Sequence, residues 1–188
     1  MKVLIVFDHP RRDSFCGAVL ERFCDGLKES GHSFEVADLR AENFDPRLPL
    51  EDEPDWDDDR KVYSVEVLAE QERVSRNDAL AFIFPVWWWS VPATTKGWID
   101  RVWNNGWAYG SCKLPQSSAL RIGTALTSSA SYQKRGYDTA IRTQMVVGVM
   151  NYCGIAKADL ELLHDVGDGD EVRSALLERA YVLGKTYF

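Results

Sequence analysis

The chain has 188 residues, of which 45% are apolar and 27% are charged, and its formal net charge is −7. This length and composition are typical of a globular protein, and we expect residues 1–188 to form a single domain. The negative charge and the lack of a basic stripe exclude nucleic acid as a partner, because nothing would replace the counterions of its phosphates.

The cysteines and the N-terminus narrow the class of protein further. Cys16, Cys24, Cys112 and Cys153 form no C-x-x-C pair, and no histidine lies at metal-ligand spacing, so we expect no metal site. The apolar run at residues 1–7 is too short for a signal peptide or a membrane span. We therefore expect a cytoplasmic protein with reduced thiols.

Short apolar runs alternate with segments of helical periodicity, which is the pattern of a parallel sheet built from βαβ units. The first helix is expected to begin at Ser14, a good N-cap residue, and to end at Gly31. Strands are expected at about 2–7, 33–37, 79–84, 119–125 and 157–162. The later helices are expected at about 64–76, 93–103, 139–153 and 170–188. These units predict an α/β fold with one doubly wound sheet of five parallel strands in the order 2-1-3-4-5, with helices on both faces.

A long acidic segment at residues 38–63 interrupts this alternation. Pro46, Pro49 and Pro54 argue against regular structure there, and the segment is longer than usual βα connections. Its most acidic part, residues 51–59, lacks the ligand spacing of a calcium loop. We expect that part to be a solvated loop.

In this topology the loops after the first, third and fourth strands meet at one edge of the sheet. The first of them runs from His9 to Phe15. The free N–H groups that follow Ser14 at the start of a helix would hold an anion, and His9 would hydrogen-bond a phosphate or a ring. An ordinary capped helix with a surface histidine is the alternative interpretation of the same residues.

The loop after the third strand, PVWWWSVP at residues 85–92, is the most informative stretch of the chain. Three consecutive tryptophans do not all point into a core, so at least one is expected to line a flat apolar surface. We expect Trp87, Trp88 and Trp89 to cover the face of a flat ring while backbone N–H groups of residues 86–89 reach its polar edge. Core packing or a dimer interface is the alternative.

The loop after the fourth strand is expected at residues 126–137 and is rich in small hydroxyl side chains. Such residues let the backbone approach a ligand closely, and Tyr132 and Tyr137 offer phenols that donate to a carbonyl oxygen; a solvated loop is the alternative.

Together the three loops predict an apolar slot with amide donors at one edge and an anion pocket at one end. This combination suits a flavin, which has a planar ring and a phosphate-bearing tail.

Several motifs point to one family. The most specific is FPVWWWSVPATTKGWIDRV at residues 84–102, which continues into GWAY at 106–109. His9, Ser14 and Phe15 match an H-x(4)-S/T-F phosphate loop, and NYCG at 151–154 resembles the end of a long helix. By these motifs the chain resembles the NAD(P)H:quinone oxidoreductases of flavodoxin-like fold, which include DT-diaphorase, modulators of drug activity and ancillary oxidoreductases of potassium-efflux systems.

The resemblance implies a role for individual residues. The cofactor would be bound by three sets of residues: His9, Ser14, Phe15 and Cys16 on the phosphate side, Pro85, Val86, Trp87, Trp88 and Trp89 beside the ring, and Leu126, Thr127, Ser128 and Ser129 at its polar edge. Tyr132 would hydrogen-bond the flavin and relay a proton as the catalytic residue. Trp107 and Tyr109 would line the substrate pocket across a homodimer interface.

The chain departs from the family pattern at two places. Ser128 and Ser129 stand where the family often has a double glycine, and their Cβ atoms would crowd the flavin edge. Some relatives place a relay histidine near Arg135, whereas residues 33–163 of this chain contain no histidine. In place of that histidine, the charge compensation would come from Arg135, from Tyr137 or from solvent, and the sequence leaves these three alternatives open.

The resemblance implies a flavin-dependent NAD(P)H oxidoreductase that passes two electrons to a quinone-like acceptor. NAD(P)H and the acceptor would use one slot in turn, which gives ping-pong kinetics. FAD is the expected cofactor, with FMN as the alternative. Two other functions stay open: a one-electron carrier of the flavodoxin type, and a regulatory subunit that docks peripherally on a cation-efflux membrane protein.

Overall fold

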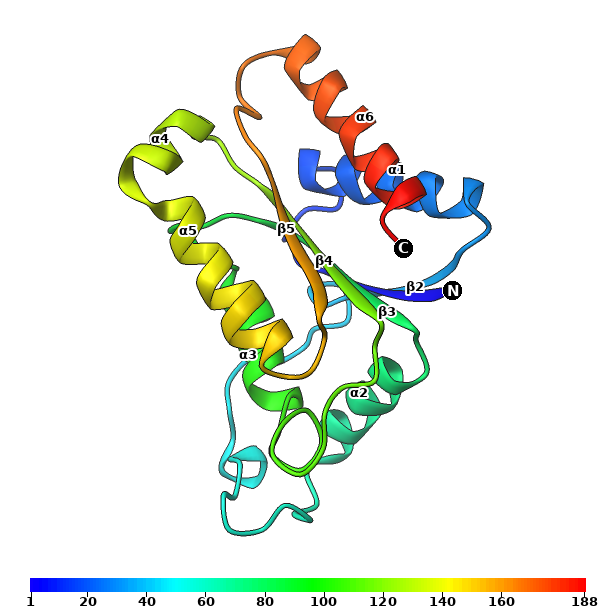
Figure 1. The fold of residues 1–188 in the computed structure, drawn as a ribbon, viewed down its shortest axis with the longest axis vertical. Helices are drawn as coiled ribbons and strands as arrows, with labels where there is room; N and C mark the ends of the chain where they lie inside the picture. The colour runs from blue at the N-terminus through cyan, green and yellow to red at the C-terminus, as the bar shows by residue number, and fades with distance from the viewer.

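The computed structural model describes residues 1–188 and contains a parallel sheet of five strands in the order β2-β1-β3-β4-β5 (Figure 1). The strands are β1 (Lys2–Phe7), β2 (Ser33–Asp38), β3 (Ala79–Pro85), β4 (Ser118–Thr124) and β5 (Lys157–Leu163). The helices are α1 (Phe15–Glu29), η1 (Leu50–Asp52), α2 (Val65–Ser75), α3 (Ala93–Val102), α4 (Ser129–Arg135), α5 (Tyr137–Arg142), η2 (Thr143–Asn151) and α6 (Asp170–Thr186). The predicted fold class and strand order are therefore confirmed.

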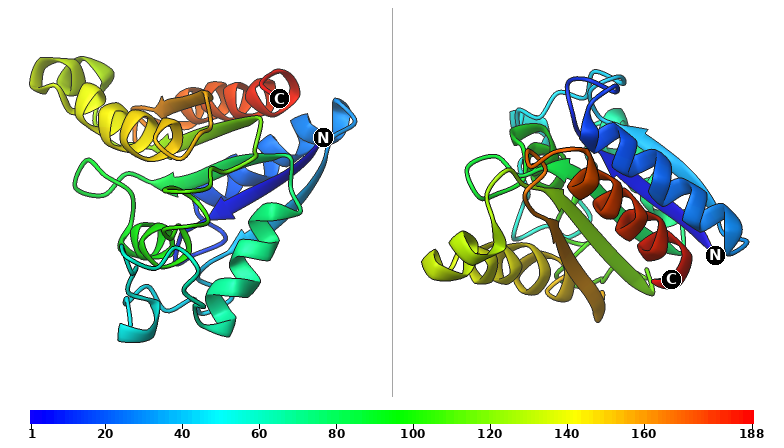
Figure 2. Two further views of the ribbon diagram at one scale, coloured as in Figure 1. Left: turned by 60° about the horizontal axis from the view of Figure 1, so that its bottom comes forward. Right: turned by 90° about the horizontal axis from the view of Figure 1, so that it is seen from above.

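The sheet separates two apolar cores, because successive residues of a strand point to opposite faces. Val3, Ile5 and Phe7 pack on the face that α1 and α6 cover, whereas Leu4 and Val6 pack on the face with α2, α3 and η2. Both faces of β1, β3 and β4 are buried, which explains why these strands read as nearly continuous apolar runs. Figure 2 shows α1 and α6 side by side on their face of the sheet.

Two glycines allow α1 and α6 to lie this close. A Cβ atom on Gly26 of α1 would come within 2.1 Å of the Tyr181 carbonyl oxygen. A Cβ atom on Gly184 of α6 would come within 2.2 Å of the Phe23 carbonyl oxygen. Any larger residue at either position would force the two helices apart.

The prediction of a helix at residues 139–153 is wrong about where the helix begins and about which type of helix it is. The chain is already helical at Tyr137, in α5, and continues into η2, a π-helix with i→i+5 hydrogen bonds such as Tyr152 N–H to the Val147 carbonyl oxygen at 3.2 Å. The loop expected at residues 126–137 also contains a helix, α4. The Ser128 hydroxyl caps α4, and Gly136 ends it in the left-handed conformation, at φ 69°.

Apart from the single turn η1, the acidic segment after β2 is irregular, as predicted, but it is not solvated throughout. The Asp52 side chain is fully buried and accepts hydrogen bonds from the backbone N–H of Ser64 at 2.9 Å and from the Arg101 guanidinium at 2.8 Å. Arg101 also pairs with Glu66 at 2.7 Å. Burial opposes this ionised state, yet the bonds from Arg101 and Ser64 lower the pKa of Asp52. The segment is thus fastened to α3 by a buried charge pair.

None of the helices combines the length and apolarity needed to span a bilayer. All four cysteines are free, and no three His, Cys, Asp or Glu side chains gather in a way that would hold a metal ion.

Arg121 on β4 is a buried cation without a counter-ion. Its side chain lies on the face shared with Phe82, whose ring centroid is 4.8 Å from the guanidinium carbon. The residue is 1% exposed, and none of its three guanidinium nitrogens has a hydrogen-bond partner. Burial lowers the pKa of Arg121 from 12.5 to about 9. The position therefore reduces the stability of the fold.

We expect Arg121→Met to raise the free energy of unfolding at pH 7 by about 1–3 kcal/mol, because an unpaired buried charge is removed. Between about pH 9 and pH 12.5, Arg121 is protonated in the unfolded state but not in the folded state. The stability of the wild type therefore rises with pH in this range, and the advantage of the variant shrinks. Urea unfolding at pH 7 and pH 10 measures both effects. Arg60→Met, at an exposed position, is the control and should stay within about 0.5 kcal/mol of wild type. Lower stability of the Arg121 variant at pH 7 would contradict this account.

Candidate functional site

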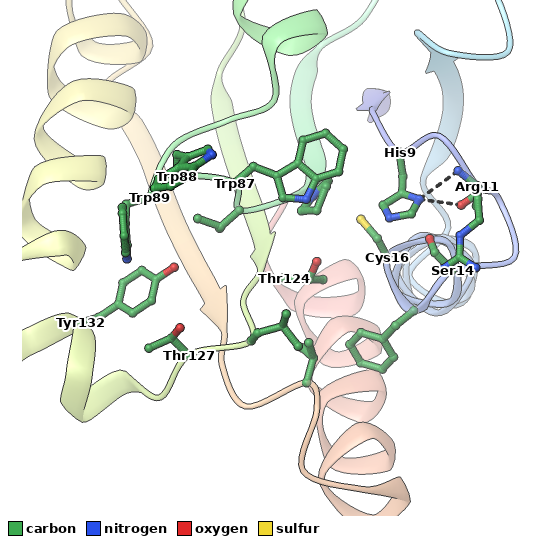
Figure 3. Close-up of a pocket in the computed structure, with 15 residues that line it drawn as sticks. His9, Arg11, Ser14, Cys16, Trp87, Trp88, Trp89, Thr124, Thr127 and Tyr132 are labelled. Carbon is green, nitrogen blue, oxygen red and sulfur yellow. Dashed lines mark hydrogen bonds between the residues drawn. The ribbon is translucent and has the colours of Figure 1, made fainter.

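A pocket of about 450 Å³ opens at the carboxyl ends of β1, β3 and β4 (Figure 3). The strand register brings these ends together, because Phe7 pairs with Ile83 and Pro85 pairs with Thr124. Ligands of open α/β sheets bind at this edge. The pocket is lined by His9, Arg11, Ser14, Phe15, Cys16, Pro85, Val86, Trp87, Trp88, Trp89, Thr124, Leu126, Thr127, Tyr132 and Val166.

One end of the pocket presents N–H groups and a cation. The Ser14 hydroxyl oxygen accepts from the Gly17 N–H at 3.2 Å, which confirms Ser14 as the N-cap of α1. The N–H groups of Phe15 and Cys16 have no carbonyl partner, so they and the helix dipole favour negative charge here. Arg11 lines the same end and forms no ion pair within the chain, so its cation is available to a ligand.

The thiol of Cys16 lies on the pocket wall but is not a nucleophile. The residue is 2% exposed, and burial raises the pKa of the thiol to about 12, although a hydrogen bond with Thr124 opposes this shift. The thiolate is the reactive form of cysteine. At neutral pH, Cys16 therefore contributes a small apolar surface.

Asp8, which follows β1 directly, ties two of the pocket loops together. Its carboxylate is buried and accepts from both the backbone N–H and the hydroxyl of Thr95, each at 2.8 Å. The other carboxylate oxygen accepts from Arg40 Nε at 3.0 Å. Because Thr95 lies in the first turn of α3, this bond fixes the tryptophan loop relative to His9.

The tryptophans occupy a tight turn with an unusual backbone. Trp87 and Ser90 exchange two N–H···O hydrogen bonds of 3.1 Å, and Trp88 and Trp89 between them have φ values of 50° and 57°. Positive φ at both central residues defines a type I′ turn, which favours Asn and Gly and is strained for bulky side chains. Strain of this kind gathers at functional sites.

This turn decides which amide groups face the pocket. The N–H of Val86 donates to the Thr124 carbonyl oxygen at 2.9 Å, and the N–H of Trp87 closes the turn. The prediction that residues 86–89 all offer amide donors is therefore wrong for Val86 and Trp87. The N–H groups of Trp88 and Trp89 have no backbone partner.

The other end of the pocket is aromatic. Trp88 contacts Trp89 edge to face, at 5.8 Å between ring centroids, and Trp89 lies 4.3 Å from Tyr137. Tyr137 in turn contacts Tyr132, and Figure 3 shows the Tyr132 hydroxyl directed towards Trp88 and Trp89. Trp87 bridges the two ends, since its ring lies 6.2 Å from that of His9. The pocket therefore joins an anion end to an aromatic end.

Tyr132 offers a phenol that remains protonated. The residue is 3% exposed, and burial raises its pKa. Its place on α4, a helix that the sequence did not predict, turns the ring into the pocket rather than into solvent. At neutral pH, Tyr132 is therefore a hydrogen-bond donor.

The structure brings most of the predicted cofactor residues into this one pocket, but Ser128 and Ser129 do not line it. Ser128 is the N-cap of α4 instead. Three lining residues were missed: Arg11, Thr124 and Val166. Thr124 is the last residue of β4, so its position at a strand end could have predicted that it lines the pocket. Nothing in the sequence predicts the same for Val166.

Trp107 and Tyr109 lie elsewhere in the chain. Trp107 packs on the core below the sheet, and Tyr109 lines a second, apolar pocket of about 320 Å³ together with Trp103 and Tyr152. No residue lines both pockets. Within one chain, these two residues therefore do not complete the first pocket.

A doubly wound sheet with an anion-binding helix start and an aromatic slot at its carboxyl edge defines a class of α/β proteins that bind nucleotide cofactors. Residues 1–182 match the model of the flavodoxin-like fold family, and the chain belongs to that family. This confirms the family predicted from the sequence.

The relatives agree with this assignment. The chain is 34% identical over 177 residues to the uncharacterized NAD(P)H oxidoreductase YcaK of Escherichia coli, covering 93% of this chain and 90% of the relative. It is 33% identical over 177 residues to the ribosyldihydronicotinamide dehydrogenase (quinone) of Pongo abelii, covering 81% and 77%. The NAD(P)H:quinone oxidoreductase structure from Methanothermobacter marburgensis matches with a TM-score of 0.95 and 35% identity, covering 100% of this chain and 96% of that one.

We expect Trp88→Gly to raise the free energy of unfolding by about 1 kcal/mol, because glycine adopts positive φ without strain. Little packing is lost, since Trp88 is 88% exposed. Trp88→Ala, which removes the ring but keeps a Cβ atom, is the matched control and should not gain this stability. Chemical unfolding of both variants measures the difference, and equal stability of the two would show that the turn is unstrained.

Proposed function

We propose that this protein is a flavin-dependent NAD(P)H oxidoreductase that reduces a quinone-like acceptor by two electrons. The observation that carries the proposal is the union of an anion end and an aromatic slot in one pocket. The relatives described above support it, because they are named NAD(P)H oxidoreductase, ribosyldihydronicotinamide dehydrogenase (quinone) and NAD(P)H:quinone oxidoreductase.

The residues present fit a flavin nucleotide. The N–H groups of Phe15 and Cys16, the Ser14 hydroxyl and Arg11 would bind the phosphates. Trp87 would lie along the ring, and the N–H groups of Trp88 and Trp89 would donate to its polar edge. When bound, the flavin accepts a hydride from NAD(P)H and supplies two electrons to the acceptor.

The chain's own residues orient the bound acceptor and supply a proton to it. Trp88 and Trp89 exclude water from one side of the slot and hold a planar acceptor by stacking. The Tyr132 phenol donates to a ligand oxygen at the aromatic end and helps to relay a proton. NAD(P)H and the acceptor use the same slot in turn, so the reaction follows ping-pong kinetics.

We propose FAD as the cofactor, with FMN as the competing outcome, because the sequence motifs resemble those of DT-diaphorase; the loop at His9, Ser14 and Phe15 suits either cofactor. Ser128 and Ser129 do not oppose this, since neither lines the pocket whose edge they were expected to crowd.

We further propose that the protein acts as a cytoplasmic homodimer. Trp56 and Tyr152 are more than half exposed, and their ring centroids lie 5.7 Å and 5.9 Å from that of Tyr109, which lines the second pocket. Exposed apolar side chains gathered around a pocket are typical of an interface. In a dimer, Trp107 and Tyr109 of one chain would approach the slot of the other.

The absorbance spectrum of the purified protein, followed by anaerobic titration with NADH or NADPH, tests the function. We expect flavin bands that bleach directly to the two-electron state, and parallel steady-state lines when donor and acceptor are varied. Chromatography of the released cofactor distinguishes FAD from FMN. A stable neutral semiquinone would favour a one-electron carrier, and a protein that cannot be loaded with flavin would favour a binding subunit. Trp88→Ala should lose flavin, whereas Val65→Ala, which alters an exposed apolar side chain at the start of α2 and outside the pocket, should keep it.

We expect Tyr132→Phe to retain flavin and to lower kcat about tenfold to a thousandfold, because a proton donor is removed while the ring is kept. Tyr137→Phe is the matched control on the same aromatic wall and should change kcat less. Unchanged turnover in the Tyr132 variant would remove Tyr132 from the mechanism.

A further inference from the structure

The ring of Tyr137 packs more closely on the ring of Trp89 than any other two aromatic rings of the chain pack on each other. The two centroids are 4.3 Å apart, and the planes are tilted by 32°. Trp89 lines the first pocket, whereas Tyr137, the first residue of α5, does not. Tyr137 therefore influences the slot through a neighbour rather than by touching what the slot holds.

Tyr137 also contacts a second residue of the pocket wall. Its ring meets that of Tyr132 edge to face, with 5.8 Å between the centroids and an angle of 84°. Gly136 makes this contact possible, because it ends α4 in the left-handed conformation and α5 begins at the next residue. Figure 3 shows Trp89 and Tyr132 at the same end of the pocket. One ring outside the pocket thus links a wall of the slot to its phenol donor.

The tryptophan turn needs support from outside itself. Trp88 and Trp89 have positive φ, and bulky residues keep this conformation only where the surrounding structure fixes it. Trp88 is 88% exposed and gives little support. The Ser90 hydroxyl donates to Gln144 Oε1 of η2 at 3.3 Å, and Trp89 packs on Tyr137. Because α5 runs directly into η2, one helical segment fixes the turn at two adjacent residues.

We propose that Tyr137 is a positioning residue that fixes Trp89 relative to Tyr132 and thereby restricts the slot to flat acceptors. A wall that is held in place admits a planar ring and rejects substituents that stand out of the ring plane, because the slot does not widen for them. Both contacts are made by the ring of Tyr137, so its hydroxyl has no part in this role. The inference deepens the proposed function and rests on it.

Two quinones of different thickness test the selectivity: benzoquinone, which is flat, and its di-tert-butyl derivative. We expect Tyr137→Ala to lower the ratio of kcat/KM for the flat quinone to kcat/KM for the bulky one by about tenfold, because the freed wall moves aside. The KM for benzoquinone should rise more than its kcat falls. The different reduction potentials of the two quinones cancel when variants are compared.

Tyr137→Phe is the matched control, because it keeps both ring contacts and removes only the hydroxyl. It should leave the selectivity ratio within about twofold of the wild type. A wild-type ratio in Tyr137→Ala would overturn the proposal. So would a loss in Tyr137→Phe as large as that in Tyr137→Ala, since the hydroxyl would then be the group that matters.

A double-mutant cycle tests whether Tyr137 acts through Trp89. In a Trp89→Ala background, Tyr137→Ala should change the selectivity ratio less than about twofold, because the wall that it holds is already gone. Effects that multiply would show an independent action of Tyr137 and would refute this route.

A readout that needs neither flavin nor turnover separates this inference from the proposed function. The protein is labelled with fluorotryptophan, its 19F spectrum is recorded without cofactor, and the Trp89 signal is assigned with Trp89→Phe. We expect Tyr137→Ala to shift and broaden this signal, and Tyr137→Phe to leave it sharp. The signal of Trp56, which is exposed and packs on Tyr109 instead, should stay the same in all variants.

The two proposals can therefore fail separately. An unchanged Trp89 signal in Tyr137→Ala overturns the positioning role, even if flavin binding is found. A shifted and broadened signal supports it, even if the protein does not bind flavin and the proposed function fails.

Discussion

The buried carboxylate of Asp8 is the interaction on which the site depends. It lies at the end of β1 and accepts hydrogen bonds from the first turn of α3 and from Arg40. The loop that follows β1 and the loop that carries the tryptophans are thereby held at a fixed separation. Each loop alone is an ordinary connection on the edge of a sheet, and only their relative placement makes a slot with two different ends.

The pocket also concentrates features that reduce stability. Two tryptophans adopt positive φ, several aromatic side chains remain exposed at its mouth, and two N–H groups at each end have no carbonyl partner. Such destabilising features persist where binding requires them, because a natural fold tolerates a local loss of stability at a functional site. Arg121 is different, since it is buried against Phe82 and lines no part of this pocket.

The relatives and the geometry support one chemistry from independent directions. The relatives identify a family of NAD(P)H-dependent oxidoreductases, while the pocket supplies an anion end, a flat aromatic wall and a protonated phenol. Tyr109 lines a second, apolar pocket that shares no residue with the first, so within one chain it adds nothing to that slot.

The sequence by itself determined the sheet, its strand order, the cap at Ser14 and most of the pocket lining, because apolar periodicity and loop position are local signals. It did not predict α4, since a seven-residue helix between Ser128 and Gly136 has too few apolar positions to show a period. The burial of Asp52 and the engaged amides of Val86 and Trp87 were decided by the tertiary structure. So was the contact between the rings of His164 and Tyr132, because His164 directly follows β5 whereas Tyr132 lies on α4, after the neighbouring strand β4.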